Sequence, residues 1–219
     1  MIHHILITHD HADHIKSVGS ISDSFNIPVY STQAVHEGIA KNWCVKKKVS
    51  PNQVRYVEKG KTQQIGDFTV TPFAVPHDSS DCVGYCVQCE GITFTLVTDC
   101  GHVTEEICAF VAKANYLVIE ANHEVEKLMA GPYPLYLKER ITSQIGHLSN
   151  AECARTIVEN ATENLKHVWL CHLSDENNHP ELARIAVTSL MESYGLRAGV
   201  DFIVEVLRRK IPSEIYDLK

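Results

Sequence analysis

The stretch Thr8-His9-Asp10-His11-Ala12-Asp13-His14 carries the strongest chemical signal in the sequence. It directly follows the short apolar run Ile5-Leu6-Ile7, which is typical of a buried strand. It precedes Ile15-Lys16-Ser17-Val18, where a helical pattern begins. The stretch is therefore predicted to form a strand-to-helix turn that carries several polar side chains.

Three histidines and an aspartate of this turn are candidate metal ligands. Side chains one residue apart in a turn converge, so His9 and His11 are predicted to share one cation. Asp13 and His14 are predicted to face a second cation at the start of the helix. Imidazole nitrogen and carboxylate oxygen suit zinc, manganese or iron, and no thiolate is required.

Length and composition are those of a soluble globular protein. A chain of 219 residues with 44% hydrophobic and 21% charged residues can bury a sizeable core, and we expect one domain over residues 1–219. The net charge of -7 does not by itself favour nucleic acid, so such a substrate needs a local basic patch or the metals themselves. The sequence has no apolar run of about twenty residues and no expected signal peptide, so it predicts no membrane partner.

The eight cysteines are mostly scattered within apolar segments, which predicts free thiols and a cytoplasmic location. Cys86 and Cys89 have the spacing of a redox or zinc motif, but they lie in an extended pattern. Residues three apart in a strand point to opposite faces, so we expect these two to pack rather than to chelate one ion.

Strands in the first half of the sequence come largely as hairpins, whereas later strands alternate with helices, which predicts an α/β layered domain. The expected strands are residues 5–7, 28–30, 54–57, 67–75, 82–89, 92–98, 116–120, 168–171 and 202–206. The expected helices begin at residue 15 and span residues 32–41, 104–114, 151–161 and 180–194.

Three more candidate ligands each follow an apolar strand. His77 follows the strand that ends at Val75-Pro76, Asp99 follows one that ends at Thr98, and His172 follows one that ends at Cys171. Ligands at strand ends on one rim of a sheet can meet, because the strands hold them in place. With the first motif, their number fits two cations.

These residues, taken together, resemble the signature of the metallo-β-lactamase superfamily of metal-dependent hydrolases. Longer strings resemble its YycJ/VicX-type branch, which is related to ribonuclease J and tRNase Z. These strings are Pro76-His77-Asp78, Val83-Gly84-Tyr85, Thr98-Asp99-Cys100-Gly101, Glu120-Ala121-Asn122-His123, Gly131-Pro132-Tyr133-Pro134, Gly146-His147-Leu148-Ser149-Asn150 and His172-Leu173-Ser174-Asp175-Glu176-Asn177-Asn178.

The resemblance implies a four-layer αββα sandwich with two divalent metal ions, for which zinc is preferred over manganese or iron. It implies that one ion is bound by His9, His11 and His77, the other by Asp13, His14 and His172, and that Asp99 bridges them.

Members of the family begin with further strands before the histidine motif, whereas the strand that carries the motif here starts at Met1 or Ile2. We therefore expect the first N-terminal strands of the fold to be absent. The open sheet edge favours pairing with another chain, so a homodimer is expected as one way to cover it.

The predicted function is hydrolysis of a phosphodiester, in DNA, RNA or a small molecule, by a metal-activated water. Asp13 is the candidate that orients or deprotonates this water. His147, just before a predicted helix, is the candidate that binds a phosphate or protonates the leaving group. The local alternative for His147 is a hydrogen bond at the helix start, and His123 is expected to have a structural role.

Two alternatives to a nuclease remain open at this point. One is a hydrolase of carboxylic esters, thioesters or lactones on the same scaffold. The other is an inactive metal-binding fragment, which the missing N-terminal part would favour.

Overall fold

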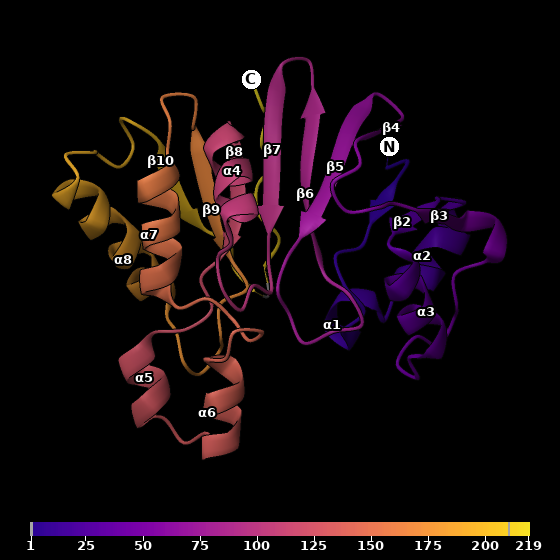
Figure 1. Ribbon diagram of the computed structural model, residues 1–219, viewed down its shortest axis with the longest axis horizontal. Coiled ribbons are helices and arrows are strands. Elements are labelled where there is room, and N and C mark those ends of the chain that lie inside the picture. Colours follow the sequence, from indigo (N-terminus) through magenta and orange to yellow (C-terminus); the bar gives the residue numbers. More distant parts are fainter. Residues whose placement is uncertain (1, 210) are drawn as a thin grey trace. The chain divides into compact units, whose positions relative to one another are not determined.

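The computed structural model describes residues 2–209 and 211–219, and the chain divides into two compact units. The first unit comprises Met1–Ala74 and Asp78–Tyr85, and the second comprises Val75–His77 and Cys86–Lys219. Each unit has strands and helices of its own (Figure 1). The single domain expected from the sequence stays a prediction.

The first unit is built on a parallel three-stranded sheet with the strand order β1-β2-β3 and on an antiparallel pair of strands, β4 and β5. Its strands are β1 (Ile5–Leu6), β2 (Val29–Ser31), β3 (Val54–Tyr56), β4 (Gln63–Ile65) and β5 (Phe68–Ala74). Its helices are α1 (Ala12–Ile15), α2 (Val18–Phe25), α3 (Gln33–Lys41) and the short 3-10 helix η1 (Pro51–Gln53).

Apolar side chains from the strand before the histidine motif and from the helices after it form the core of this unit. This cluster consists of Ile7, Ile15, Val18, Val29, Val35, Ile39 and Val45. Helix α3 begins where the Thr32 hydroxyl accepts a hydrogen bond from the amide of Val35. The core fixes the strand that leads into the motif and the helices that leave it.

The second unit is built on a parallel sheet in which β10, β9, β8 and β7 are neighbours in that order, with β6 next to β7. Its strands are β6 (Val83–Cys89, which begins in the first unit), β7 (Ile92–Val97), β8 (Tyr116–Glu120), β9 (His167–Cys171) and β10 (Ile203–Val206). The central strand β8 is buried almost throughout, as parallel strands covered on both faces are.

Helices accompany this sheet, and two short ones lie beyond the ends of its strands (Figure 1). They are α4 (Glu105–Lys113), α5 (Val125–Ala130), α6 (Leu135–Ile141), α7 (Asn150–Asn160) and α8 (Pro180–Ser193). Helix α7 begins with a capping box, in which Ser149 and Glu152 exchange side-chain to backbone hydrogen bonds. This cap fixes the chain just after His147.

The strands predicted over residues 82–89 and 92–98 are confirmed and are neighbours in the sheet, and Glu90 and Gly91 form the turn between them with φ angles of 50° and 79°. Positive φ at both positions is what a two-residue turn between twisted strands needs. The helix expected from Ile15 instead consists of α1 and α2 and begins at Ala12, so Asp13 and His14 lie in its first turn, at the helix start as predicted. Strand β4 and helices α5 and α6 were not predicted.

All eight cysteines are free thiols, as the sequence predicts. Cys86 is buried and Cys89 is half-buried, which fits their alternation along β6. Among the described residues, no helix combines the length and the apolar character that crossing a membrane requires.

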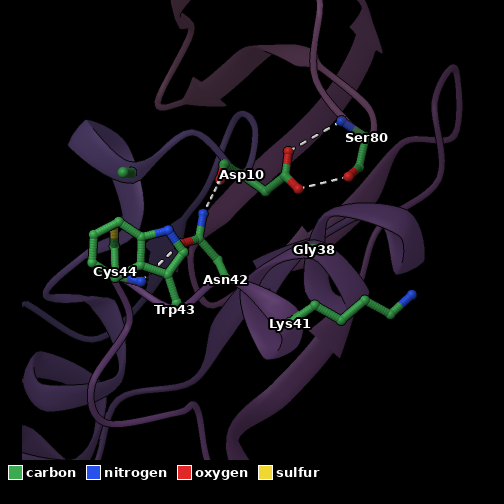
Figure 2. A pocket seen from close by; sticks show the side chains of 8 residues that line it. Asp10, Gly38, Lys41, Asn42, Trp43, Cys44 and Ser80 are labelled. Carbon is green, nitrogen blue, oxygen red and sulfur yellow. Dashed lines mark hydrogen bonds between the residues drawn. The ribbon is translucent and has the colours of Figure 1, made fainter.

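Gly38 of α3 allows the carboxylate of Asp10 to pack directly on the helix backbone. A Cβ atom at Gly38 would lie 1.8 Å from Asp10 Oδ2, which is too close for any real contact. The same carboxylate accepts hydrogen bonds from the Ser80 hydroxyl at 2.6 Å and the Ser80 amide at 3.1 Å (Figure 2). Gly38 therefore keeps this part of the histidine motif in place.

We predict that Gly38→Ala lowers the free energy of unfolding by about 1 kcal/mol. Alanine in a helix interior normally gains about 1 kcal/mol over glycine, but here it displaces a charged hydrogen-bond acceptor whose bonds contribute about 1.5–3 kcal/mol. Denaturant unfolding measures the change. In an Asp10→Gly background the same substitution should be stabilising, and a stabilising effect in the wild type would contradict the packing argument.

Candidate metal centre

Three chemically active side chains lie at the carboxyl ends of three adjacent parallel strands of the second unit. Asp99 follows β7, Glu120 is the last residue of β8, and His172 follows β9. Because parallel strands end at the same edge of a sheet, their terminal side chains gather there, as in many α/β binding sites. The sheet thus places two carboxylates and an imidazole in one small region.

Asp99 and His172 have a backbone conformation that residues other than glycine rarely adopt. Their φ angles are 55° and 54°, in the left-handed region. Such conformations cost free energy and persist where the surrounding structure holds them, often at functional sites. Here they turn the chain sharply at the strand ends.

Glu120 is fully buried and accepts hydrogen bonds from four donors. Its Oε1 atom lies 2.7 Å from His172 Nδ1 and 2.8 Å from His147 Nδ1. Its Oε2 atom accepts from the amides of Cys100 at 2.9 Å and Leu148 at 3.2 Å. A carboxylate accepts without donating, so Glu120 fixes the proton of both histidines at Nδ1.

His77 has the same tautomer for a similar reason. Its Nδ1 atom lies 3.1 Å from the carbonyl oxygen of Gly146, which can only accept a hydrogen bond. In neutral His77, His147 and His172, Nε2 is therefore the acceptor atom of the ring. Histidines that bind metal through one nitrogen commonly donate from the other in this way.

Asp99 is the carboxylate at which these imidazoles meet. Its Oδ1 atom lies 3.5 Å from His172 Nε2 and 3.7 Å from His77 Nε2. Its other oxygen accepts a hydrogen bond from Thr98. Asp99, Glu120, His147 and His172 each offer a ligand atom within 4.8 Å of the others. The donor set consists of nitrogen and carboxylate oxygen, so it fits zinc, manganese or iron.

The buried charges of this cluster stabilise one another. Burial alone would raise the pKa of Glu120, but the hydrogen bonds and charges of His147 and His172 hold this pKa well below its usual range. Burial alone would lower the pKa of His147. The hydrogen bond to Glu120 and the negative charges of Glu120 and Asp99 outweigh burial, so the pKa of His147 is raised. Glu120 therefore stays an anion and favours a protonated His147.

In the first unit, the histidine motif is compact. The ring centroid of His9 lies 4.8 Å from that of His11 and 4.1 Å from that of His14. His11 Nε2 lies 3.0 Å from the carbonyl oxygen of Asp78, which leaves Nδ1 of a neutral His11 as its acceptor atom. His14 Nε2 lies 3.7 Å from the carboxylate of Asp13. The four predicted ligands of this motif thus lie close together.

Each unit therefore gathers the predicted ligands that it contains: His9, His11, Asp13 and His14 in the first, and His77, Asp99 and His172 in the second. His147 lies in the second cluster. Glu120 was not predicted as a site residue. A single acidic residue that ends an apolar strand has no diagnostic spacing, although its burial in the run Tyr116-Leu117-Val118-Ile119 was a usable signal.

Sequence comparison identifies the class of protein. The profile of the beta-lactamase superfamily domain matches residues 1–172. The chain belongs to the metallo-β-lactamase superfamily, as the histidine motif predicted.

Among individual relatives, the chain is 33% identical over 215 residues to the exodeoxyribonuclease YycJ of Bacillus anthracis, with 96% of this chain and 79% of the relative covered. It is 36% identical over 200 residues to the exodeoxyribonuclease WalJ of Streptococcus pneumoniae, with 91% of this chain and 74% of the relative covered.

Solved structures agree on the fold. The metallo-β-lactamase fold protein YhfI of Bacillus subtilis has a TM-score of 0.68 at 17% identity, with 94% of this chain and 75% of that chain covered. Zinc-bound PqqB of Methylobacterium extorquens has a TM-score of 0.65 at 18% identity, with 94% and 69% covered. The predicted α/β fold class is confirmed, with helices flanking the sheets.

We predict that Glu120→Gln destabilises the protein by about 1–3 kcal/mol, which is the cost of leaving a buried donor unpaired. The amide group of glutamine would face either the two histidine N–H groups or the two backbone amides, so donors oppose donors in both orientations. Denaturant unfolding measures the loss. Glu124→Gln is the control, because half-buried Glu124 accepts from Asn150 only through Oε2 and glutamine keeps an acceptor there. Equal stability of the two variants would contradict the four-donor description.

Proposed function

We propose that the protein is a metal-dependent phosphodiesterase that acts on DNA as an exonuclease. The observation that carries the proposal is the cluster around Asp99. Glu120 orients His172 and the Gly146 carbonyl orients His77, and the Nε2 atoms of both rings lie within 3.7 Å of the Asp99 carboxylate. Family membership and the exodeoxyribonuclease activity named for both relatives support the substrate class.

The proposed centre uses the ligand set that the family signature implies. His9, His11 and His77 would hold one divalent cation, Asp13, His14 and His172 the second, and Asp99 would bridge them. We favour zinc over manganese, because five of the seven groups are imidazoles, and iron accepts the same ligands. The chemistry that such a pair supplies when bound is a lower pKa for water and neutralisation of phosphate charge.

Asp13 is proposed to orient the attacking water and to take its proton. Its side chain is 70% exposed and lies at the start of α1, so it is accessible to water and substrate. His14 beside it keeps the carboxylate within 3.7 Å of an imidazole nitrogen. A carboxylate at this position can accept a hydrogen bond, and then the proton, from a water molecule.

His147 is proposed to serve the leaving group. With Nδ1 bound to Glu120, the Nε2 atom of protonated His147 carries the proton that can be transferred. The Gly146 backbone packs closely on Ile141, where a Cβ would lie 2.2 Å from the carbonyl oxygen, and the bond from Nδ1 to Glu120 holds the ring. The ring is therefore oriented before substrate binds, which general acid catalysis requires.

The substrate class is tested with the wild-type protein reconstituted with zinc or manganese. We expect release of nucleotides from end-labelled DNA and hydrolysis of bis-(p-nitrophenyl) phosphate, because both are phosphodiesters. A lactone and a thioester are the matched comparison substrates. Faster turnover of either of these than of both phosphodiesters would contradict the proposal and favour an ester or lactone hydrolase.

We predict that His147→Ala keeps the metal content and slows phosphodiester turnover by about 10²- to 10⁴-fold, the usual loss when acid–base help is removed. Asp99→Ala should lose metal and activity together. Metal analysis and single-turnover rates measure the two effects. Loss of metal from His147→Ala would show that His147 is a metal ligand. This is the main alternative to a role in acid catalysis, because His147 lies close to Asp99 and His172.

A further inference from the structure

Trp43 is a large aromatic side chain that the proposed chemistry does not use. It is 80% exposed and lies in the turn that follows α3. An exposed tryptophan loses the free energy that its burial would contribute, so its position calls for a ligand or partner. The ring lies beside a cavity of about 500 Å³ in the first unit (Figure 2).

The histidine motif itself forms one wall of this cavity. Asp10 and Ala12, which alternate with His9, His11 and Asp13, line it together with Gly38 and Lys41 of α3. Sites for small ligands span about 300–1,000 Å³, so the cavity has the size for one nucleotide unit rather than for a duplex. A ligand here would lie directly beside the proposed metal-binding turn.

The Trp43 turn is attached to the motif by hydrogen bonds. Asn42 donates from Nδ2 to the Asp10 carbonyl oxygen at 3.1 Å, and Asn42 Oδ1 accepts from the Cys44 amide at 2.9 Å (Figure 2). Lys48 donates to the Asn42 carbonyl oxygen at 2.6 Å. These bonds hold the residues on either side of Trp43, so the ring is presented with little loss of conformational entropy on binding.

Positive charge lies beside the ring. The Nζ atom of Lys46 lies over one face of the Trp43 ring, 5.6 Å from its centroid, so a base would stack on the opposite face. Lys41 is 80% exposed, and its Nζ atom is 4.0 Å from Glu37, an exposed pair that contributes little and leaves the ammonium accessible. Asp10, the acidic group in the cavity, is already bound by Ser80. An aromatic ring with a lysine at one face, and a second lysine at the same cavity, matches a base with its phosphates.

We propose that Trp43 is a stacking platform for an unpaired base of a DNA strand, with Lys41 and Lys46 contacting its phosphates, next to the His9–His14 motif. The inference rests on the proposed function, since it names the form of DNA that the nuclease holds. Within a duplex the base faces are covered by stacking, and only the outer face of the terminal pair is exposed, so an unpaired nucleotide fits this surface better.

Binding to a short phosphorothioate oligothymidylate, which resists cleavage, tests the platform with the metal-loaded protein. Trp43 and Trp169 are the two tryptophans, and Trp169 is 3% exposed, so fluorescence quenching by the oligonucleotide reports on Trp43. Anisotropy of a dye-labelled oligonucleotide should show about 5- to 150-fold weaker binding by Trp43→Ala. Trp43→Phe should retain most of the affinity.

Phe25→Ala is the matched control, because Phe25 is another aromatic residue of the first unit that is 71% exposed. It should bind like the wild type. Lys46→Ala should reduce the slope of log affinity against log salt by about 0.7, the value for one lost contact to single-stranded phosphate. Lys61→Ala, which removes an exposed lysine paired with Glu58, should leave the slope unchanged.

Three outcomes would overturn the platform: equal binding by Trp43→Ala and the wild type, equal quenching by a blunt duplex, or a Trp43→Ala variant that loses self-association in sedimentation but keeps its DNA affinity. The last would assign Trp43 to contacts between copies of the chain. The proposed function fails separately, if the wild type hydrolyses no phosphodiester while the oligonucleotide still quenches Trp43.

Discussion

The cluster in the second unit depends on one buried anion that satisfies four donors. Glu120 ends the central strand β8, so the sheet fixes its position, and its two oxygens connect the loop after β7, the segment before α7 and the loop after β9. A buried carboxylate is costly unless every acceptor site is used. Two of the four donors are the imidazoles of His147 and His172. The hydrogen bonds that stabilise the buried carboxylate therefore also orient these two rings.

Strain at the strand ends follows from the same arrangement. Asp99 and His172 have positive φ angles on either side of Glu120, where the parallel strands β7, β8 and β9 end. The sheet supplies rigid positions, and beyond the left-handed residues the side chains of Asp99 and His172 lie 3.5 Å apart. A site built in this way is oriented before any ligand binds, and its cost is met by the packing of the sheet.

Much of this fold could be predicted from the sequence, because apolar runs and caps are local signals. The strands that precede His77, Asp99 and His172 are where their apolar residues placed them, and the Glu90–Gly91 turn was recognisable from its glycine. Helices α5 and α6 were missed, since six or seven residues flanked by glycine and proline show too little periodicity. Glu120 was missed as a site residue because its role depends on donors that are distant in sequence.

The lysine run at residues 46–48 shows why composition alone could not identify a substrate surface. The sequence presents three equivalent cations in a chain of net charge -7. The structure gives each a different environment: Lys47 pairs with Asp23, Lys48 binds carbonyl oxygens at the end of α3, and Lys46 lies beside Trp43. Two of the three charges are therefore engaged within the fold. A positive surface for DNA on an acidic protein has to be local, and it gains selectivity for single strands only where an aromatic face accompanies the charge.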